Sequence, residues 1–169
     1  MPPALSVTIL IVLGLALLVL MVVGWRRRVR SSSDVPAPAA APADLGEARS
    51  EPLDGTYVST TRSGDWLDRV ASHGLGVRST VSVQVWDAGV ELRRRGAPDV
   101  FLPRADLLAV GTSGGMAGKV VGGEGLTVLT WQNGAHRLDT GLRMRHAADA
   151  LTLREAVTDM TEQHTKETR

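Results

Sequence analysis

Hydrophobic and polar positions divide the chain into three parts with different patterns. Residues 4–24 form an unbroken apolar run in which only Ser6 and Thr8 are polar. At about 1.5 Å rise per residue such a helix is about 31 Å long, which matches the hydrocarbon core of a bilayer. The pattern therefore predicts one transmembrane anchor over residues 1–25, because the rest of so short a chain could not enclose a helix that is apolar all round.

The second part, residues 26–52, has no apolar period. It begins with four arginines in five residues and continues into a stretch rich in Pro, Ala and Ser. Such a stretch cannot bury enough apolar surface to offset the entropy lost on ordering it. We therefore expect a stop-transfer cluster followed by a flexible spacer, whose prolines favour an extended chain of about 65 Å over residues 31–52.

From residue 53 onward, short apolar runs separated by turn residues are typical of β-strands. The clearest alternation places Val81, Val83 and Val85 on one face of a strand. The turn residues 87–89 and 133–135 each predict a hairpin. We expect seven strands, over residues 55–61, 78–86, 90–94, 100–102, 107–112, 126–132 and 136–140.

Two helical segments complete this third part. Residues 144–163 carry apolar side chains at helical spacing, which predicts an amphipathic helix packed on the sheet. Between the first two strands, residues 65–71 predict a short helical turn with Trp66, Leu67 and Val70 facing inward.

The fold expected for residues 53–163 is therefore mainly β: a bent seven-stranded sheet or partial barrel, capped by a C-terminal α-helix. The polar residues 164–169 are expected to be a frayed tail.

The distribution of charge adds an orientation. The 19 Lys and Arg nearly balance the 18 Asp and Glu, which argues against a nucleic-acid-binding protein with a broad basic surface. Trp25 suits a membrane interface, and the arginines that directly follow it set the topology by the positive-inside rule; they are Arg26, Arg27, Arg28 and Arg30. We expect the N-terminus outside an inner (plasma) membrane, the domain in the cytoplasm, and these arginines at anionic lipid head groups.

A cleaved signal peptide is the alternative interpretation of the N-terminal segment. The apolar run is too long for one, no basic residue precedes it, and the Ala-x-Ala candidates lie beyond the arginine cluster. We therefore expect the helix to remain as an anchor.

The glycine-rich stretch 111–125 holds seven glycines in fifteen residues and the pair Gly118-Lys119. A phosphate-binding P-loop needs glycine five residues before that Gly-Lys pair and Ser or Thr directly after it. Ser113 and Val120 occupy these positions. The expected structure is a flexible hairpin loop in which Lys119 contacts a partner or acidic head groups.

Arg93, Arg94 and Arg95 form a basic cluster on a predicted strand. Because strand side chains alternate, the three cannot all face one way. Together with Arg78, Arg104 and Lys119 they are candidates for an anion-binding or partner-binding site, although residues 51–169 carry 14 basic and 15 acidic residues.

No chemistry of catalysis is evident. The chain has no Cys, which excludes disulfides and thiolate chemistry, and its four histidines lack metal-ligand spacing. No Ser-His-Asp arrangement can be assembled from local motifs. We expect no metal site, no cofactor and no enzymatic activity.

Several short stretches carry a family resemblance, although they are scattered along the chain. They are residues 55–57, 64–70, 75–79 and 117–120, Trp131 followed by Gly134, and residues 138–141. On these stretches and on the element order, the chain resembles bacterial pleckstrin-homology-like (PH-like) domains. More narrowly, it is similar to actinobacterial single-span membrane proteins that carry such a domain.

The resemblance implies a fold and a location but no ligand. The function expected is that of a non-enzymatic, membrane-anchored interaction or scaffold module that binds a protein partner or a second copy of itself. The alternatives are an accessory subunit of a transporter or export system and a module that binds anionic lipid.

Overall fold

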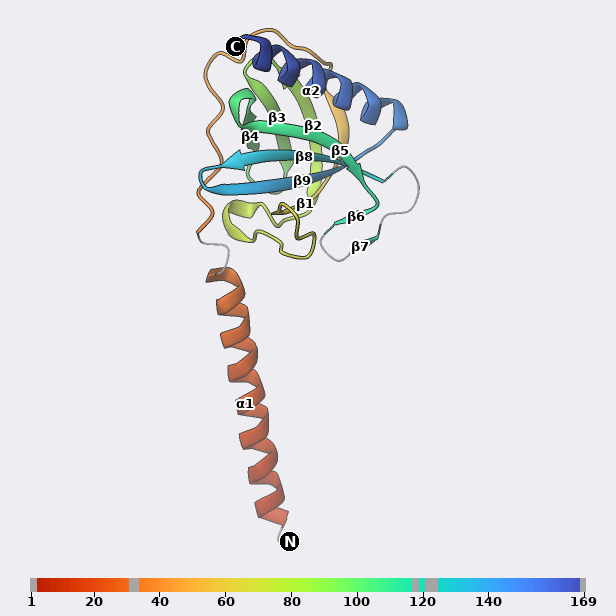
Figure 1. Ribbon diagram of the computed structural model, residues 1–169. Helices are drawn as coiled ribbons and strands as arrows, with labels where there is room; N and C mark the ends of the chain where they lie inside the picture. Colours follow the sequence, from red (N-terminus) through yellow and green to blue (C-terminus); the bar gives the residue numbers. More distant parts are fainter. Residues whose placement is uncertain (1–2, 31–33, 117–118, 121–124, 168–169) are drawn as a thin grey trace. The chain divides into compact units, whose positions relative to one another are not determined.

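The computed structural model describes the backbone of residues 3–30, 34–116, 119–120 and 125–167. It describes the side chains of residues 11–24, 34–116 and 125–163. The chain divides into two compact units, Met1–Asp34 and Val35–Arg169 (Figure 1).

The first unit is built on helix α1, which spans Pro3–Arg30. Proline is tolerated at the start of a helix, where its missing N–H would have no intrahelical partner. The apolar run that follows contains no further proline, and the side chains of residues 11–24 are all exposed. In the described part of the chain, no helix has the length and apolar character required to cross a membrane.

The second unit is built on an antiparallel seven-stranded sheet with the order β4-β3-β2-β1-β9-β8-β5 (Figure 1). Its strands are β1 (Leu53–Arg62), β2 (Ser79–Trp86), β3 (Gly89–Arg95), β4 (Val100–Pro103), β5 (Leu107–Ser113), β8 (Leu126–Asn133) and β9 (His136–Met144). Two short strands, β6 (Gly115–Met116) and β7 (Lys119–Val120), pair within the glycine-rich stretch.

Helix α2 (Ala147–Glu167) closes this unit, packed against the curved sheet (Figure 1). The mainly β fold with seven strands and a C-terminal helix is therefore confirmed. The backbone of α2 begins three residues after the predicted start at residue 144 and continues past the predicted end at residue 163.

The core lies between the inner face of the sheet and α2. Val81, Val83 and Val85 are buried together, as their alternation predicts. From α2 come Leu153, Val157 and Met160, all fully buried. Their spacing of four and three residues places them on one face of the helix. The largest fully buried side chain is that of Trp131 on β8.

A chain of hydroxyl groups crosses this core. The Tyr57 hydroxyl is hydrogen-bonded to Thr60 Oγ1 at 2.6 Å and donates to the Leu75 carbonyl at 2.9 Å. Thr60 Oγ1 lies 2.7 Å from Thr140 Oγ1, which also accepts from the Trp131 indole N–H at 3.0 Å. Burial raises the pKa of Tyr57 to about 12, although these hydrogen bonds and the nearby Arg94 oppose the shift.

Residues 35–52, predicted to belong to a flexible spacer, pack on the second unit instead; we call them the strap. Val35 at its beginning is fully buried, and the Pro36 carbonyl accepts a hydrogen bond from Asn133 Nδ2 at 2.8 Å. The prediction is wrong here because the strap is ordered mainly through its backbone groups and one buried valine, which leave no periodic apolar signal.

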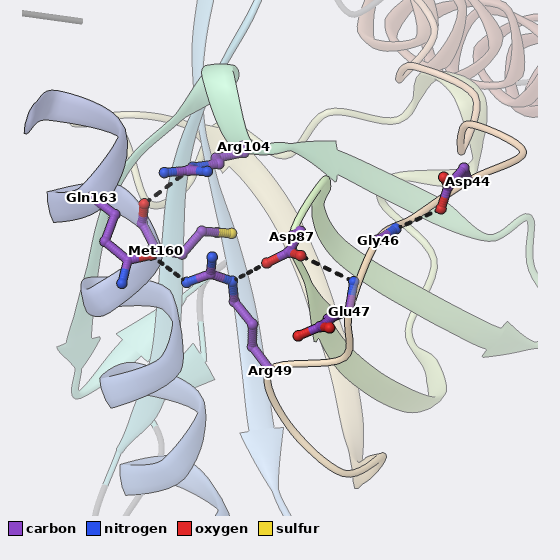
Figure 2. Close-up of polar contacts among 8 residues, drawn as sticks. All are labelled: Asp44, Gly46, Glu47, Arg49, Asp87, Arg104, Met160 and Gln163. Carbon is purple, nitrogen blue, oxygen red and sulfur yellow. Dashed lines mark hydrogen bonds and ion pairs between the residues drawn. The ribbon is translucent and has the colours of Figure 1, made fainter. Parts of the chain in front are cut away.

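The far end of the strap is held by ionic and polar contacts (Figure 2). Arg49 forms an ion pair with Asp87 at 2.6 Å and donates to Gln163 Oε1 of α2 at 2.7 Å. Asp87 also accepts from the Glu47 backbone N–H at 3.0 Å. That backbone hydrogen bond, followed by the one from Arg49, holds the pKa of Asp87 below its usual value.

The segment after β1 also differs from its prediction. Residues 65–68 close a single turn rather than a helical turn, and Arg69 then forms an isolated antiparallel bridge with Thr61. Only Val70 is buried, whereas Trp66 and Leu67 point to solvent with 48% and 53% exposure. The reason is local: Asp65 Oδ1 accepts from the backbone N–H groups of Leu67 and Asp68, which closes a tight turn.

Candidate functional site

Two of the three consecutive arginines on β3 share one solvent-facing surface. Arg93 and Arg95 are exposed, whereas Arg94 between them is 6% exposed and belongs to the interior. The alternation predicted from the sequence is therefore confirmed, and it separates the cluster into two arginines that solvent can reach and one that it cannot.

Strand register places two further arginines beside this pair. One row across β3, β2, β1 and β9 consists of Arg95, Thr80, Thr56 and Arg143. The next row begins with Arg93, Ser82 and Asp54. Arg145 extends it, because its backbone N–H donates to the Asp54 carbonyl at 3.0 Å. We call the surface carrying Arg93, Arg95, Arg143 and Arg145 the arginine face.

The arginine face is hollowed. A cavity of ≈ 590 Å³ is lined by the charged side chains of Arg93, Arg95, Arg145, Asp54 and Asp99, with Arg94 at its wall. Through Gly55, Thr80 and Arg145 it adjoins a second cavity of ≈ 350 Å³, which adds Arg78 and Arg143. A third cavity of ≈ 570 Å³ continues from Arg143 to the start of α2, where it includes His146 and Arg154. The three cavities share lining residues and together form a groove whose charged lining is mostly arginine, with Asp54 and Asp99 as its acidic members.

The charges of the groove are largely uncompensated. Arg93 pairs with Glu91 at 3.0 Å. Within the described part of the chain, by contrast, Arg78, Arg95, Arg143 and Arg145 form no ion pair. A groove with clustered positive charge and low-dielectric walls raises the local concentration of anionic ligands. Carboxylates and phosphates both match the planar fork of an arginine.

Arg94 has a structural role instead. Its guanidinium lies 3.9 Å from the centre of the Tyr57 ring. It donates to the carbonyls of Gly74 and Val77 at 2.9 and 2.5 Å, and to Ser79 Oγ at 3.0 Å. Burial lowers the pKa of Arg94. Arg94 is therefore removed from the candidate ligand-binding residues, because three hydrogen bonds and the contact with the Tyr57 ring hold its side chain in the interior.

The side chains of the other predicted site residues lie outside the described residues. They are those of Lys119, Trp25, Arg26, Arg27, Arg28 and Arg30, whose backbones belong to β7 and α1.

Arg143 and Arg145 are functional candidates that were not predicted from the sequence. Both belong to an Arg-x-Arg pattern at the end of a strand, as do Arg93 and Arg95. The Arg-x-Arg spacing can be seen in the sequence. The pairing of β1 with both β2 and β9, which brings the two Arg-x-Arg pairs onto one surface, cannot.

The described residues contain no group of three or more His, Asp or Glu side chains that could hold a metal ion. What the groove offers is instead a set of fixed hydrogen-bond donors and positive charges, interrupted by Asp54 and Asp99. This chemistry suits recognition of an anionic surface or segment.

Comparison with known families identifies the fold that carries this surface. A family model described as bacterial PH domain-like matches residues 35–158. The chain belongs to this family. The match begins at Val35, so the strap is part of the PH-like domain rather than a linker outside it. No curated protein matches the chain. A PH-like domain suggests an interaction module, and the arginine face is the candidate interaction surface.

Proposed function

We propose that this protein is a membrane-anchored, non-enzymatic interaction module whose PH-like domain binds an acidic segment of a partner protein on its arginine face. The observation that carries the proposal is the register of four strands, which gathers Arg93, Arg95, Arg143 and Arg145 on one solvent-facing surface. The cavities described above lie along this surface.

The spacing of the arginines favours a protein segment as the ligand. Residues two apart on a strand are separated by about 6.5–7 Å, and this is also the distance between alternate side chains of an extended peptide. Arg93 and Arg95 on β3 can therefore pair with carboxylates at alternate positions of one bound segment, while Arg143 near the end of β9 and Arg145 directly after it supply further positive charge beside them.

The composition of the groove argues against a lipid surface as its ligand. Asp54 and Asp99 lie among the arginines and would repel a uniformly anionic bilayer. The side chains between the arginines are hydroxyls, those of Thr56, Thr80 and Ser82, which offer hydrogen bonds rather than an apolar surface for insertion. Electrostatic complementarity of this mixed kind gives specificity toward a patterned partner.

The anchor is proposed from the sequence of α1. In the sequence, residues 4–24 are an apolar run of 21 residues, and by the positive-inside rule the arginines after them favour the cytoplasmic side. In the structure α1 is continuous over 28 residues, and its described large apolar side chains are exposed. We propose that α1 spans the inner membrane once, with the PH-like domain in the cytoplasm.

The test is peptide binding by the full chain in detergent micelles. The probe is a short fluorescent peptide with Glu at every second position, and its reference carries Gln at those positions. We expect the Glu peptide alone to bind, with an affinity that falls as salt is added. Arg143→Glu should lower that affinity by about tenfold or more.

The matched control is Arg137→Glu, which makes the same charge change on the same strand outside the groove. Equal losses for the two variants, or equal binding of the Gln peptide, would contradict the proposal. If Arg143→Glu abolished binding to anionic vesicles but left peptide binding intact, the ligand would be lipid. If it abolished only a salt-sensitive self-association, the ligand would be a second copy of the chain.

A further inference from the structure

A pair of large apolar side chains is displayed at one end of the PH-like domain. Trp66 and Leu67 are adjacent in the turn after β1 and are 48% and 53% exposed. Val77, at 48% exposure, follows in the same connection between β1 and β2. An exposed tryptophan beside an exposed leucine favours a contact surface over a solvated loop.

The turn that carries Trp66 and Leu67 is fixed by its surroundings. Asp65 Oδ1 accepts from the N–H groups of Leu67 and Asp68 at 3.0 and 3.3 Å. Asp68 forms an ion pair with Arg62 at 3.0 Å. The turn ends at Val70, which is buried and whose N–H donates to the Thr60 carbonyl. The two apolar side chains are therefore presented on a preorganised backbone, which lowers the entropy lost on contact.

The chain enters the domain at this same end. The Val35 carbonyl is hydrogen-bonded to His73 Nε2 at 3.1 Å, and His73 belongs to the β1–β2 connection that also holds Trp66. On the other side of this connection, the Ser63 N–H donates to the Arg137 carbonyl at the start of β9. The entry point of the strap and the exposed apolar pair thus share one end of the domain.

The distance along the chain from α1 to this end is short. Residues 31–34 alone separate Arg30, the last residue of α1, from the buried Val35. Five extended residue steps span at most about 18 Å. An anchored α1 would therefore keep the entry end of the domain close to the bilayer surface.

We propose that the entry end of the PH-like domain rests on the lipid bilayer, with Trp66 and Leu67 inserted at its interface. This inference depends on the proposed anchoring by α1. Tryptophan prefers the head-group region of a bilayer because its ring is apolar and its N–H is polar. Asp68 in the turn is paired with Arg62, and the exposed Arg69 and Arg137 at the same end more than offset the remaining charge of Asp65 toward anionic head groups. The arginine face is a separate surface formed by other residues and is left to the protein partner.

The absence of cysteine in the chain allows a direct test. A single cysteine, Leu67→Cys, is labelled with an environment-sensitive fluorophore in the full chain, reconstituted into bilayers that contain anionic lipid. We expect at least about a twofold rise in emission relative to the same labelled protein in detergent without lipid, and quenching by spin-labelled lipid. The matched control is Leu151→Cys, which is 52% exposed on α2, a helix at the opposite end of the domain from the β1–β2 connection (Figure 1).

The possible results separate this inference from the proposed anchor. Co-flotation of the labelled protein with the bilayers after an alkaline wash reports whether α1 anchors it. A protein that floats, with quenching at residue 67 and none at residue 151, supports the inference. A protein that floats without quenching at residue 67, or with equal quenching at both positions, overturns it and leaves the anchor standing. A protein that does not float overturns both.

Discussion

At the scale of single residues, neighbours on β3 have different environments and should respond differently to the same substitution. Arg94→Lys keeps the charge but removes the fork that contacts Gly74, Val77 and Ser79. We expect it to lower the free energy of unfolding by about 2–4 kcal/mol, because a lysine would leave buried groups unpaired. Arg95→Lys, on the exposed face, should change it by less than about 0.5 kcal/mol.

Urea unfolding of the full chain in a mild detergent measures this difference. Binding of the acidic peptide should follow the opposite order, since the Arg95 side chain is exposed at the groove, whereas that of Arg94 is buried and held by its own hydrogen bonds. Similar stability changes for the two variants would show that the buried guanidinium of Arg94 is not needed for the fold.

Tyr57 gives the domain a dependence on alkaline pH. Its pKa is raised from 10.0 to about 12 in the folded chain. The folded state thus holds the hydroxyl proton more tightly than the unfolded state, so the related stability is complete below pH 10 and is lost as the pH rises toward 12. The loss amounts to about 2–3 kcal/mol.

Because Tyr57 is the only tyrosine of the chain, the change in tyrosinate absorbance with pH reports its ionisation without contribution from other tyrosines. We expect the absorbance to appear near pH 12 or together with unfolding. In Tyr57→Phe the alkaline loss of stability over this range should shrink. A tyrosinate midpoint near pH 10 in chain that is still folded would contradict the assigned burial.

At the scale of elements, the strap behaves as part of the core. Val35→Ala should lower the free energy of unfolding by about 1.5–3 kcal/mol, because Val35 is fully buried and its truncation leaves a cavity. The same substitution at Val77, which is 48% exposed, should change it by less than about 0.5 kcal/mol. Equal, small effects in urea unfolding would mean that the strap is detached in solution.

The elements differ in how far the sequence predicts them. Strands such as β2 and β3 are predicted because one of their faces is buried, and burial imposes an alternation that can be counted. The strap leaves no such signal, since a single buried valine and several backbone carbonyls order it. The turn at Trp66 is mispredicted because apolar side chains are expected to be buried, whereas here the capping by Asp65 turns two of them outward.

At the scale of the whole molecule, net charge is a poor guide to the surface of this domain. Residues 51–169 carry 14 basic and 15 acidic residues, yet among the described residues the lining of the groove along the arginine face holds several arginines and two aspartates, Asp54 and Asp99. Antiparallel pairing brings the ends of β3 and β9, far apart in sequence, onto one surface. Half of the site, Arg93 and Arg95, follows from local alternation, whereas Arg143 and Arg145 require knowledge of the register.

The strap also decides how the domain would bear a mechanical load. Tension applied through the N-terminal helix would reach Val35 first, and then the hydrogen bond between Pro36 and Asn133. The ion pair of Arg49 with Asp87 would be loaded only after these contacts had opened. The contacts would be peeled one after another, and the strands of the sheet would carry force only once all had parted. Under tension the strap would thus detach from the domain and extend before the sheet begins to unfold.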